Sequence, residues 1–425
     1  MRTIIKNATV VEAIAPGGSE QLELRDIYIE DGRFVEAFDS NDAKIIDASG
    51  LHLFSGLIDA HVHLREPGQE YKEDIESGTK SAARGGFTSV MCMPNTEPVA
   101  DNAAVISFIK ERAAKVGHVN VFPIGAATKG LNGKELAEYG LMKEAGAVAV
   151  SDDGAPISTA GMLRRTLEYA ADFGLMVINH CEDKTLSNGG IMNEGYNSTI
   201  MGIEGSPVAA EDIMVARDIL VAEYLNLPVH IAHVSSKGAV ELIRQAKARG
   251  VRVTAETCPQ YFVLTDDACL GYNTLAKAYP PMRRPEDIDA IIAGLQDGTL
   301  DIIATDHAPH HEDEKDMEFS KAKNGMIGFE TAFQLAYTYL GQQGHLSLSD
   351  LARVMSQRPS EIFKLGRGSL AVGSPADLTL VDLSRDVIVD RFKSVSKSQN
   401  SPFHGYQLKS DVVCTIVNGE EAYRE

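Results

Sequence analysis

The sequence predicts an α/β fold, a (β/α)8 TIM-type barrel with a small β-sandwich domain built from both termini. Three observations predict it. The middle of the chain repeats eight times a short apolar run followed by a longer segment with helical spacing. Both ends instead alternate apolar and polar positions in short runs. The chain has 425 residues, 44% of them hydrophobic, which is enough for one large domain and a smaller one.

The two ends of the chain share the alternating pattern that is typical of the strands of a small sheet. Near the N-terminus the runs are TIIKNATVV, DIYIEDGRFV and KIIDASGLHL, and near the C-terminus they are GSLAVGSPADLTLVDLSRDVIVD and VVCTIVNGEEAY. Gly, Asp and Asn turns separate them, as expected of short strands. We therefore expect residues 1–54 and 367–425 to form one β-sandwich domain and residues 55–366 to form the barrel.

Eight nearly continuous apolar runs in the middle of the chain are typical of parallel strands buried on both faces. The segments between them have helical spacing, and many end in Gly, the usual C-terminal stop of a helix. Eight such alternations within roughly 300 residues favour a closed barrel over an open sheet. The predicted strands are GLIDAHVH, FTSVMCM, VNVFPI, AVAVSD, LMVINH, PVHIAHV, VRVTAET and DIIATD.

Composition excludes several classes of partner. The formal net charge is -20, and the sequence has no cluster of Lys and Arg interleaved with aromatic residues, the pattern that binds a phosphate backbone. We therefore expect neither nucleic acid nor membrane as a partner. The five cysteines form no CxxC pair, which suits reduced thiols. With no apolar leader and no run of about 18 apolar residues, we expect a cytoplasmic protein.

Histidines and aspartates gather at the C-terminal ends of the predicted strands. Side chains at i and i+2 of a strand share a face, so His61 and His63 can point together into the barrel mouth. Barrel active sites lie at this face, where residues far apart in sequence converge. The residues at these strand ends are His61, His63, Asp153, His180, His233 and Asp306. Asp152 is adjacent to Asp153 but would face the other way, so we expect it to have a supporting or structural role.

Four imidazoles and two carboxylates form a ligand set that zinc prefers, with manganese, cobalt or iron as substitutes. Six ligands are too many for one catalytic ion that must also hold water, so we expect two divalent ions that share a bridging carboxylate. His230 lies out of phase with His233, and we interpret it as a packing residue. The other histidines are interpreted as structural or solvated: His52, His118, His307, His311, His345 and His404.

Several motifs together resemble the class I bacterial dihydroorotases of the amidohydrolase superfamily. The resemblance covers nearly the whole chain, and the combination of HLREPG with MPNT is much more specific than His-x-His alone. The other segments that carry it are SDDG, NHCED, HIAHVSS, ETCPQYF, YPPMR, TDHAPH and the C-terminal GSLAVGSPADLTLVD.

The resemblance implies a division of the metal ligands. His61, His63 and Asp306 would hold one ion, His180 and His233 would hold the other, and Asp153 would bridge them. Hydantoinases and dihydropyrimidinases usually bridge their metals with a carboxylated lysine near the end of strand four. The segment AVAVSDDG offers aspartate there and no lysine.

The resemblance also implies an activity, the reversible cyclisation of N-carbamoyl-L-aspartate to L-dihydroorotate in de novo pyrimidine (UMP) biosynthesis. A hydroxide bridging the two metals would attack the ring carbonyl, and Asp306 would act as general acid and base. A guanidinium fork is the best match for the carboxylate of this substrate. The residues implied in substrate binding are Arg65, Asn95, His310 and Gly325.

One departure keeps other functions open. Tyr279 stands where the family typically has Asn before Pro-Pro, which adds bulk and removes an amide. The alternatives are a cyclic amidase of the hydantoinase or allantoinase type and an inactive dihydroorotase-like scaffold that binds aspartate transcarbamoylase. The resemblance further suggests a homodimer.

Overall fold

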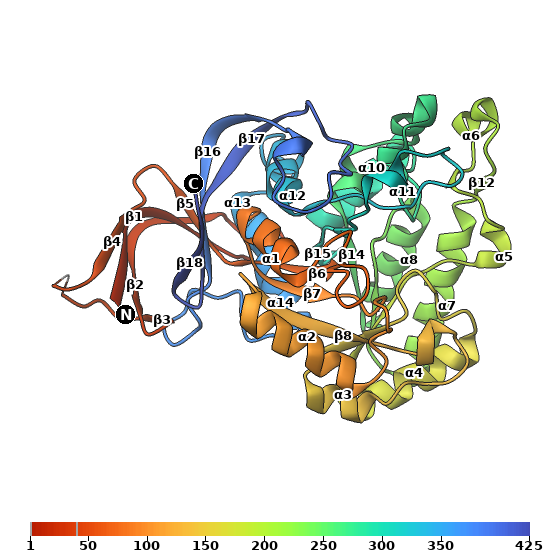
Figure 1. The fold of residues 1–425 in the computed structure, drawn as a ribbon, viewed down its shortest axis with the longest axis horizontal. Coiled ribbons are helices and arrows are strands. Elements are labelled where there is room, and N and C mark those ends of the chain that lie inside the picture. The colour runs from red at the N-terminus through yellow and green to blue at the C-terminus, as the bar shows by residue number, and fades with distance from the viewer. Residues whose placement is uncertain (1, 40) are drawn as a thin grey trace.

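The chain forms a β/α barrel and, at one end of the molecule, a second sheet to which both termini contribute (Figure 1). This computed structural model describes residues 2–39 and 41–425. Within these residues, no helix has both the length and the apolar character needed to cross a membrane.

The barrel consists of eight parallel strands, each at the place that the apolar runs predict, so the predicted barrel is confirmed. Each strand pairs with the strand next to it in the chain. In chain order they are β6 (Leu57–Val62), β7 (Phe87–Cys92), β8 (Asn120–Ala126), β9 (Ala149–Ser151), β10 (Met176–Asn179), β13 (Val229–Ile231), β14 (Val253–Thr257) and β15 (Ile302–Ile303).

The last strand meets the first at the C-terminal face of the barrel. A parallel bridge joins Val62 to His307, and the backbone N–H of His63 donates to the carbonyl oxygen of His307 at 2.9 Å. Buried Asp59 supports the same seam, since its Oδ1 accepts from the N–H of Thr305 at 3.1 Å. The barrel is therefore nearly closed, and the ends of β6 and β15 are held together.

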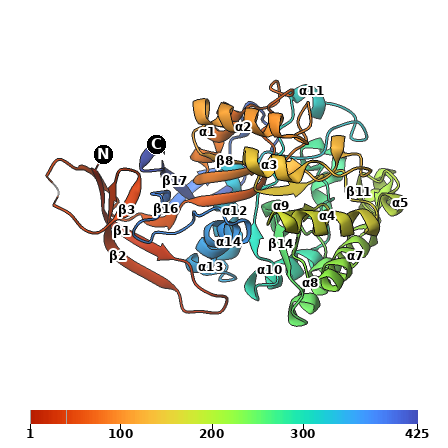
Figure 2. The same cartoon turned by 90° about the horizontal axis from the view of Figure 1, so that it is seen from below.

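Helices surround the strands (Figure 2). Asp74 and Ser77 form a capping box at the start of α1, and Asn102 and Ser236 cap α2 and α8. The helices that follow the strands are α1 (Ile75–Arg84), α2 (Ala103–Val116), α3 (Tyr139–Ala145), α4 (Ala160–Asp172), α7 (Ala209–Leu225), α8 (Lys237–Ala248), α10 (Pro285–Gln296) and α12 (Phe329–Ala336).

The barrel interior below the C-terminal face is a packed apolar layer. Inward side chains of the strands meet the ring of Phe363, which comes from α14 (Arg358–Phe363). Such layers fill TIM barrels and leave no pore, so polar groups collect above the layer or are paired inside it. The layer contains Ala60, Met91, Met93, Ile124, Ala149, Ile178, Ala232, Ile302, Ala304 and Phe363.

The second sheet combines five strands from the N-terminal part with three from the C-terminal part, and most of its pairs are antiparallel. This confirms the β unit predicted from both termini, while the limits 1–54, 55–366 and 367–425 stay a prediction. The strands are β1 (Arg2–Glu12), β2 (Gln21–Glu30), β3 (Arg33–Val35), β4 (Lys44–Asp47), β5 (His52–Ser55), β16 (Leu378–Ile388), β17 (Gln407–Val417) and β18 (Glu420–Arg424).

This sheet curls around a core of its own. Phe34 in β3 exchanges backbone hydrogen bonds with residues 373 and 374, just before β16, at 2.8 and 3.0 Å. One apolar cluster joins Ile27 and Ile29 of β2 to Leu378 and Ile416 of the C-terminal strands. The two ends of the sheet therefore face each other across a shared core.

Candidate metal centre and substrate cavity

The six predicted metal ligands lie at or just beyond the ends of five barrel strands. His61 lies in β6 and His63 just after it, while the other four follow β9, β10, β13 and β15. Three of them, Asp153, His233 and Asp306, have positive φ angles of 49°, 31° and 51°. Non-glycine residues rarely adopt this conformation, and it concentrates at functional sites.

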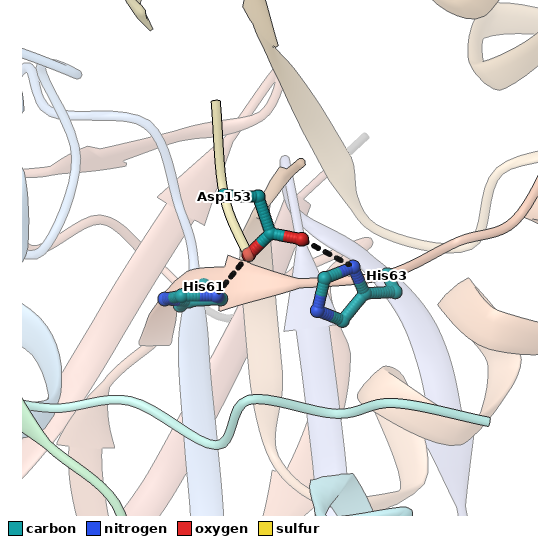
Figure 3. Close-up of side chains that lie close together, drawn as sticks. All are labelled: His61, His63 and Asp153. Atoms are coloured by element: carbon teal, nitrogen blue, oxygen red, sulfur yellow. Dashed lines mark ion pairs between the residues drawn. The ribbon is translucent and has the colours of Figure 1, made fainter. Parts of the chain in front are cut away.

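His61, His63, Asp153 and Asp306 converge at the centre of this face. Nε2 of His61 lies 3.4 Å from Oδ1 of Asp153 and 3.6 Å from Oδ1 of Asp306. The same Asp306 oxygen is 3.1 Å from Nε2 of His63, whose Nδ1 is 3.9 Å from Oδ2 of Asp153. Figure 3 shows Asp153 above both histidines, with one oxygen directed at each.

His180 and His233 form a second group beside the first. Nδ1 of His180 lies 2.8 Å from Nε2 of His233, and the rings pack edge to face with centroids 4.7 Å apart. The His233 ring is also 5.2 Å from the ring of His61, which joins the two groups. The structure thus brings all six predicted ligands together.

The electrostatics of this cluster follow from burial and from charge. Burial alone would raise the pKa of Asp153, but the charges of His63 and His61 outweigh it and hold the pKa below its ordinary value. Burial lowers the pKa of His233 to about 3, and the charges of His180 and His61 add to this effect. Ionised carboxylates therefore lie beside a neutral His233 and a protonated His61, whose pKa the charge of Glu256 raises against the effect of burial. A metal ion would displace that proton on binding.

The cluster fits divalent metal ions. Among the described residues, Nε2 of His61, Nε2 of His180 and Nδ1 of His233 are buried without a hydrogen-bond partner. A buried nitrogen left in that state costs free energy unless something takes its lone pair or proton. Imidazoles mixed with carboxylates are ligands that zinc accepts.

Three residues outside the predicted ligand set contact these histidines. Glu256 accepts from Nδ1–H of His61 at 2.6 Å, and Oδ1 of Asn95 lies 3.0 Å from Nδ1 of His63. Oε2 of Glu182 lies 3.6 Å from Nε2 of His180. For His61 and His63, such partners at Nδ1 leave Nε2 free for a metal. Of the three, Asn95 was expected only as a substrate contact.

A cavity of about 400 Å³ opens above the cluster. It is lined by five of the six predicted metal ligands and by all four predicted substrate residues, while His61 lies deeper and is 1% exposed. The predicted residues lining it are His63, Arg65, Asn95, Asp153, His180, His233, Asp306, His310 and Gly325.

Arg65 and His310 form a basic wall of this cavity. Nε–H of Arg65 donates to the carbonyl oxygen of Pro309 at 3.2 Å, yet Arg65 has no ion pair among the described residues. Its side chain is buried, so its charge is only partly compensated. Burial lowers the pKa of His310 to about 3, which keeps this imidazole neutral.

Gly325 and Asn95 occupy crowded positions in the wall. Gly325 has a φ of 118°, and a Cβ there would lie 2.6 Å from Cβ of Ala308, so only glycine fits. The amide of Asn95 is shared, because its Nδ2 donates to Oδ2 of Asp153 at 2.6 Å while Oδ1 faces His63. One amide hydrogen of Asn95 remains for another partner.

Tyr279 lines the cavity from the side of His180. Its ring stacks on the His180 ring at a centroid distance of 5.5 Å and an interplanar angle of 17°. Its hydroxyl donates to Oε1 of Glu182, which also accepts from Ser187. The Tyr279 side chain therefore contacts a histidine and a carboxylate, and its hydroxyl already has a hydrogen-bond partner in the protein.

Two other residues received different interpretations from the sequence. Asp152 accepts from the backbone N–H and the hydroxyl of Thr128 at 2.8 and 2.5 Å, which is a structural role. His230 packs edge to face on Phe363, as expected of a packing residue, but it also lies 3.2 Å from Glu256.

Comparison with known proteins identifies similar families. Residues 50–239 match the family model described as Dihydro-orotase-like. A dihydroorotase from Acetivibrio thermocellus is 56% identical over 405 residues, 95% of each chain. A dihydroorotase from Ruminiclostridium cellulolyticum is 52% identical over 428 residues, covering 100% of this chain and 99% of its own.

Solved structures of hydantoinases share the architecture. The L-hydantoinase (dihydropyrimidinase) from Arthrobacter aurescens superimposes with a TM-score of 0.89 at 28% identity, covering 99% of this chain and 96% of its own. The dihydropyrimidinase from Brevibacillus agri gives 0.86 at 24% identity, over 100% of this chain and 95% of its own. The second likeness bears on the fold alone.

Proposed function

The chain belongs to the dihydroorotase family and is a cyclic amide hydrolase, and from that premise we propose a binuclear metal centre with assigned residue roles. The reaction is the reversible cyclisation of N-carbamoyl-L-aspartate to L-dihydroorotate, the ring closure of de novo pyrimidine biosynthesis. One observation supports the residue roles most strongly. In the cavity, Arg65, which is buried and has no ion pair among the described residues, faces the cluster of histidines and aspartates.

Two divalent ions, with zinc preferred, would share the cluster. His61, His63 and Asp306 would hold one ion, His180 and His233 the other, and Asp153 would lie between them. When bound, such ions lower the pKa of a water molecule and polarise a carbonyl oxygen. The unpartnered ring nitrogens of the cluster support this assignment.

Asp306 is the proposed proton carrier. In the hydrolytic direction, it accepts a proton from the attacking water as the new C–O bond forms at the ring carbonyl. It then delivers that proton to the ring nitrogen as the C–N bond breaks, and cyclisation reverses these steps. Its place between His63 and the cavity supports this role, because one carboxylate can there reach both the ligands and the substrate.

Arg65, Asn95, His310 and Gly325 would hold the substrate. The guanidinium of Arg65 is buried and forms no ion pair with a carboxylate among the described residues, so it can pair with the carboxylate of the substrate. The free amide hydrogen of Asn95 adds a directional hydrogen bond, His310 would contact the substrate from the same wall, and the backbone at Gly325 leaves room for the ring. The carboxylate is thereby held at one end of the cavity, and the amide faces the metal ligands.

Tyr279 and the hydantoinase-like fold make a hydantoinase the second candidate. Hydantoins lack the ring carboxylate, so the unpaired charge of Arg65 favours dihydroorotate. The test follows cyclisation of N-carbamoyl-L-aspartate and, in parallel, hydrolysis of hydantoin and allantoin. Turnover of carbamoyl-aspartate supports the proposal, and turnover of hydantoin or allantoin alone would overturn it.

We also propose a cytoplasmic location and a homodimer, with association with aspartate transcarbamoylase as a further possibility. All five cysteines are buried and unpaired, which supports a reducing compartment. Light scattering of the purified protein, with and without aspartate transcarbamoylase, tests both assemblies.

A further inference from the structure

A chain of hydrogen bonds runs through the barrel interior from the metal cluster towards the opposite end. Nδ1–H of His61 donates to Oε1 of Glu256 at 2.6 Å. The other oxygen of Glu256 lies 3.2 Å from Nε2 of His230, and Nδ1 of His230 lies 2.8 Å from the hydroxyl of Thr254. His61, Glu256 and His230 are at most 1% exposed.

The strand register explains why these side chains meet. Glu256 and Thr254 are two residues apart in β14, so both face the barrel interior. His230 pairs with Thr254 in the parallel register of β13 and β14, which places its ring beside both. Thr254 also lines a separate cavity of about 580 Å³, bounded by Gly250 and Arg353.

The carboxylate of Glu256 determines which ring nitrogens carry hydrogen in this chain of hydrogen bonds. A carboxylate only accepts, so both ring nitrogens that contact Glu256 must carry hydrogen. Nδ1 of His61 is then protonated, and Nε2, which lies beside Asp153 and Asp306, is the nitrogen left for a metal ion. With hydrogen on Nε2, His230 can accept at Nδ1 from the hydroxyl of Thr254, which lies 2.8 Å away.

Glu256 also contacts the second ligand group. Its Oε1 accepts from the backbone N–H of His233 at 3.4 Å. One buried carboxylate thus touches a ligand of each proposed metal ion, the side chain of His61 and the main chain of His233. Neither Glu256 nor His230 lines the substrate cavity, so neither contacts the substrate.

We propose that Glu256 is a positioning residue of the metal centre, and that His230 and Thr254 hold it in place. Glu256 sets the tautomer and ring orientation of His61 and supplies a negative charge behind it. The inference rests on the proposed metal site and extends it to residues outside the ligand set. Partners of this kind typically account for about 10- to 100-fold in metal affinity or activity.

The experiment measures zinc affinity of the metal-free full-length protein by competition with a chromophoric chelator. The main variant is Glu256→Gln, which keeps the shape of the side chain and removes its charge. We expect its zinc affinity to fall about 10- to 100-fold. We also expect the KM for carbamoyl-aspartate at saturating zinc to stay at the wild-type value, because the cavity is untouched.

A matched pair at residue 230 keeps the proposal testable if Glu256→Gln fails to fold. His230→Leu removes the donor to Glu256, whereas His230→Gln can retain one. Zinc affinity should fall in the first and recover in the second. A merely structural role would lower the thermal stability of the metal-free protein without this recovery of zinc affinity.

The control is Glu330→Gln, which alters an ion-paired carboxylate on α12 that contacts Arg84 and Ser394 and none of the metal-cluster histidines. Its zinc affinity should equal that of the wild type. Wild-type zinc affinity in folded Glu256→Gln, or equal affinities in the two His230 variants, would overturn the inference. A wild-type protein that binds zinc but does not turn over carbamoyl-aspartate would instead refute the proposed function alone.

Discussion

Nη2 of Arg65 lies 3.4 Å from Nε2 of His310, and both side chains line the cavity above the metal ligands. Nε2–H of His310 also donates a hydrogen bond to the carbonyl oxygen of Asn324 at 2.8 Å. The imidazole is neutral and fixed, and the guanidinium beside it carries the charge. We propose that this guanidinium is the site for the substrate carboxylate.

Arg65→Gln should weaken substrate binding. The variant loses charged hydrogen bonds to the substrate carboxylate, which are worth about 1.5 to 3 kcal/mol, so kcat/KM should fall about 10- to 100-fold. Steady-state kinetics in both directions measures this, together with metal content, which should not change. The control is Arg164→Gln on the exposed face of α4, and an unaltered kcat/KM in Arg65→Gln would refute the carboxylate site.

Asp306→Asn should lose turnover and keep the fold. The amide is nearly isosteric and can still offer an oxygen to a metal, but it cannot carry the proton between water and ring nitrogen. General acid–base groups contribute about 10²- to 10⁴-fold, and kcat should fall by that amount. Elemental analysis of the same sample separates loss of metal from loss of the proton carrier. Activity near the wild-type level would exclude this role.

Tyr279→Phe should change stability more than catalysis. The hydroxyl donates to buried Glu182, so its removal leaves that carboxylate short of a donor and costs about 1 to 3 kcal/mol in the free energy of unfolding. Urea denaturation measures this cost. The KM should stay within a few-fold of wild type, because the ring still stacks on His180. A large rise in KM would show that the hydroxyl contacts the substrate.

Lys315 should give stability a defined pH dependence. Its ammonium donates to the carbonyl oxygens of Lys323 and Gly325 at 2.7 and 3.1 Å, beside the cavity. Burial lowers its pKa from 10.5 to about 7, and the charge of Lys277 adds to this. Between these two pKa values the unfolded chain binds more protons than the folded one, so the free energy of unfolding should rise with pH.

Lys315→Met tests that dependence directly. Urea denaturation of wild type and variant at several pH values from 7 to 10 compares the two slopes, and one group contributes at most about 1.4 kcal/mol per pH unit. The variant should show the flatter slope. Parallel curves would mean that the pKa of Lys315 in the folded protein is not lowered.

The barrel strands and the convergence of the candidate ligands were predictable because each depends on a local pattern. The eight barrel strands are apolar runs, and the histidines and aspartates lie at or just beyond their ends. α7 shows the limit of this approach. The segment with helical spacing, VARDILVAEYLN, begins at Val215. The helix itself begins at Ala209, where Glu211 and Asp212 in the first turn favour an N-terminus.

The residues that orient the ligands were missed because their partners are distant in sequence. Glu256 acts on His61 across 195 positions, and Glu182 meets Tyr279 across 97. A signal was present, since Glu256 is a carboxylate in a predicted barrel strand, two residues from Thr254 and therefore on the same face of that strand. Such a group requires a buried partner, but only the barrel register identifies His230 and His61 as those partners.

The most direct test of the account follows cyclisation of N-carbamoyl-L-aspartate by metal-free protein as zinc is added in measured equivalents. Activity should be absent at the start, rise with zinc, and reach its plateau at two equivalents per chain. Full activity at one equivalent, activity without metal, or no cyclisation at any zinc content would contradict the binuclear dihydroorotase assignment.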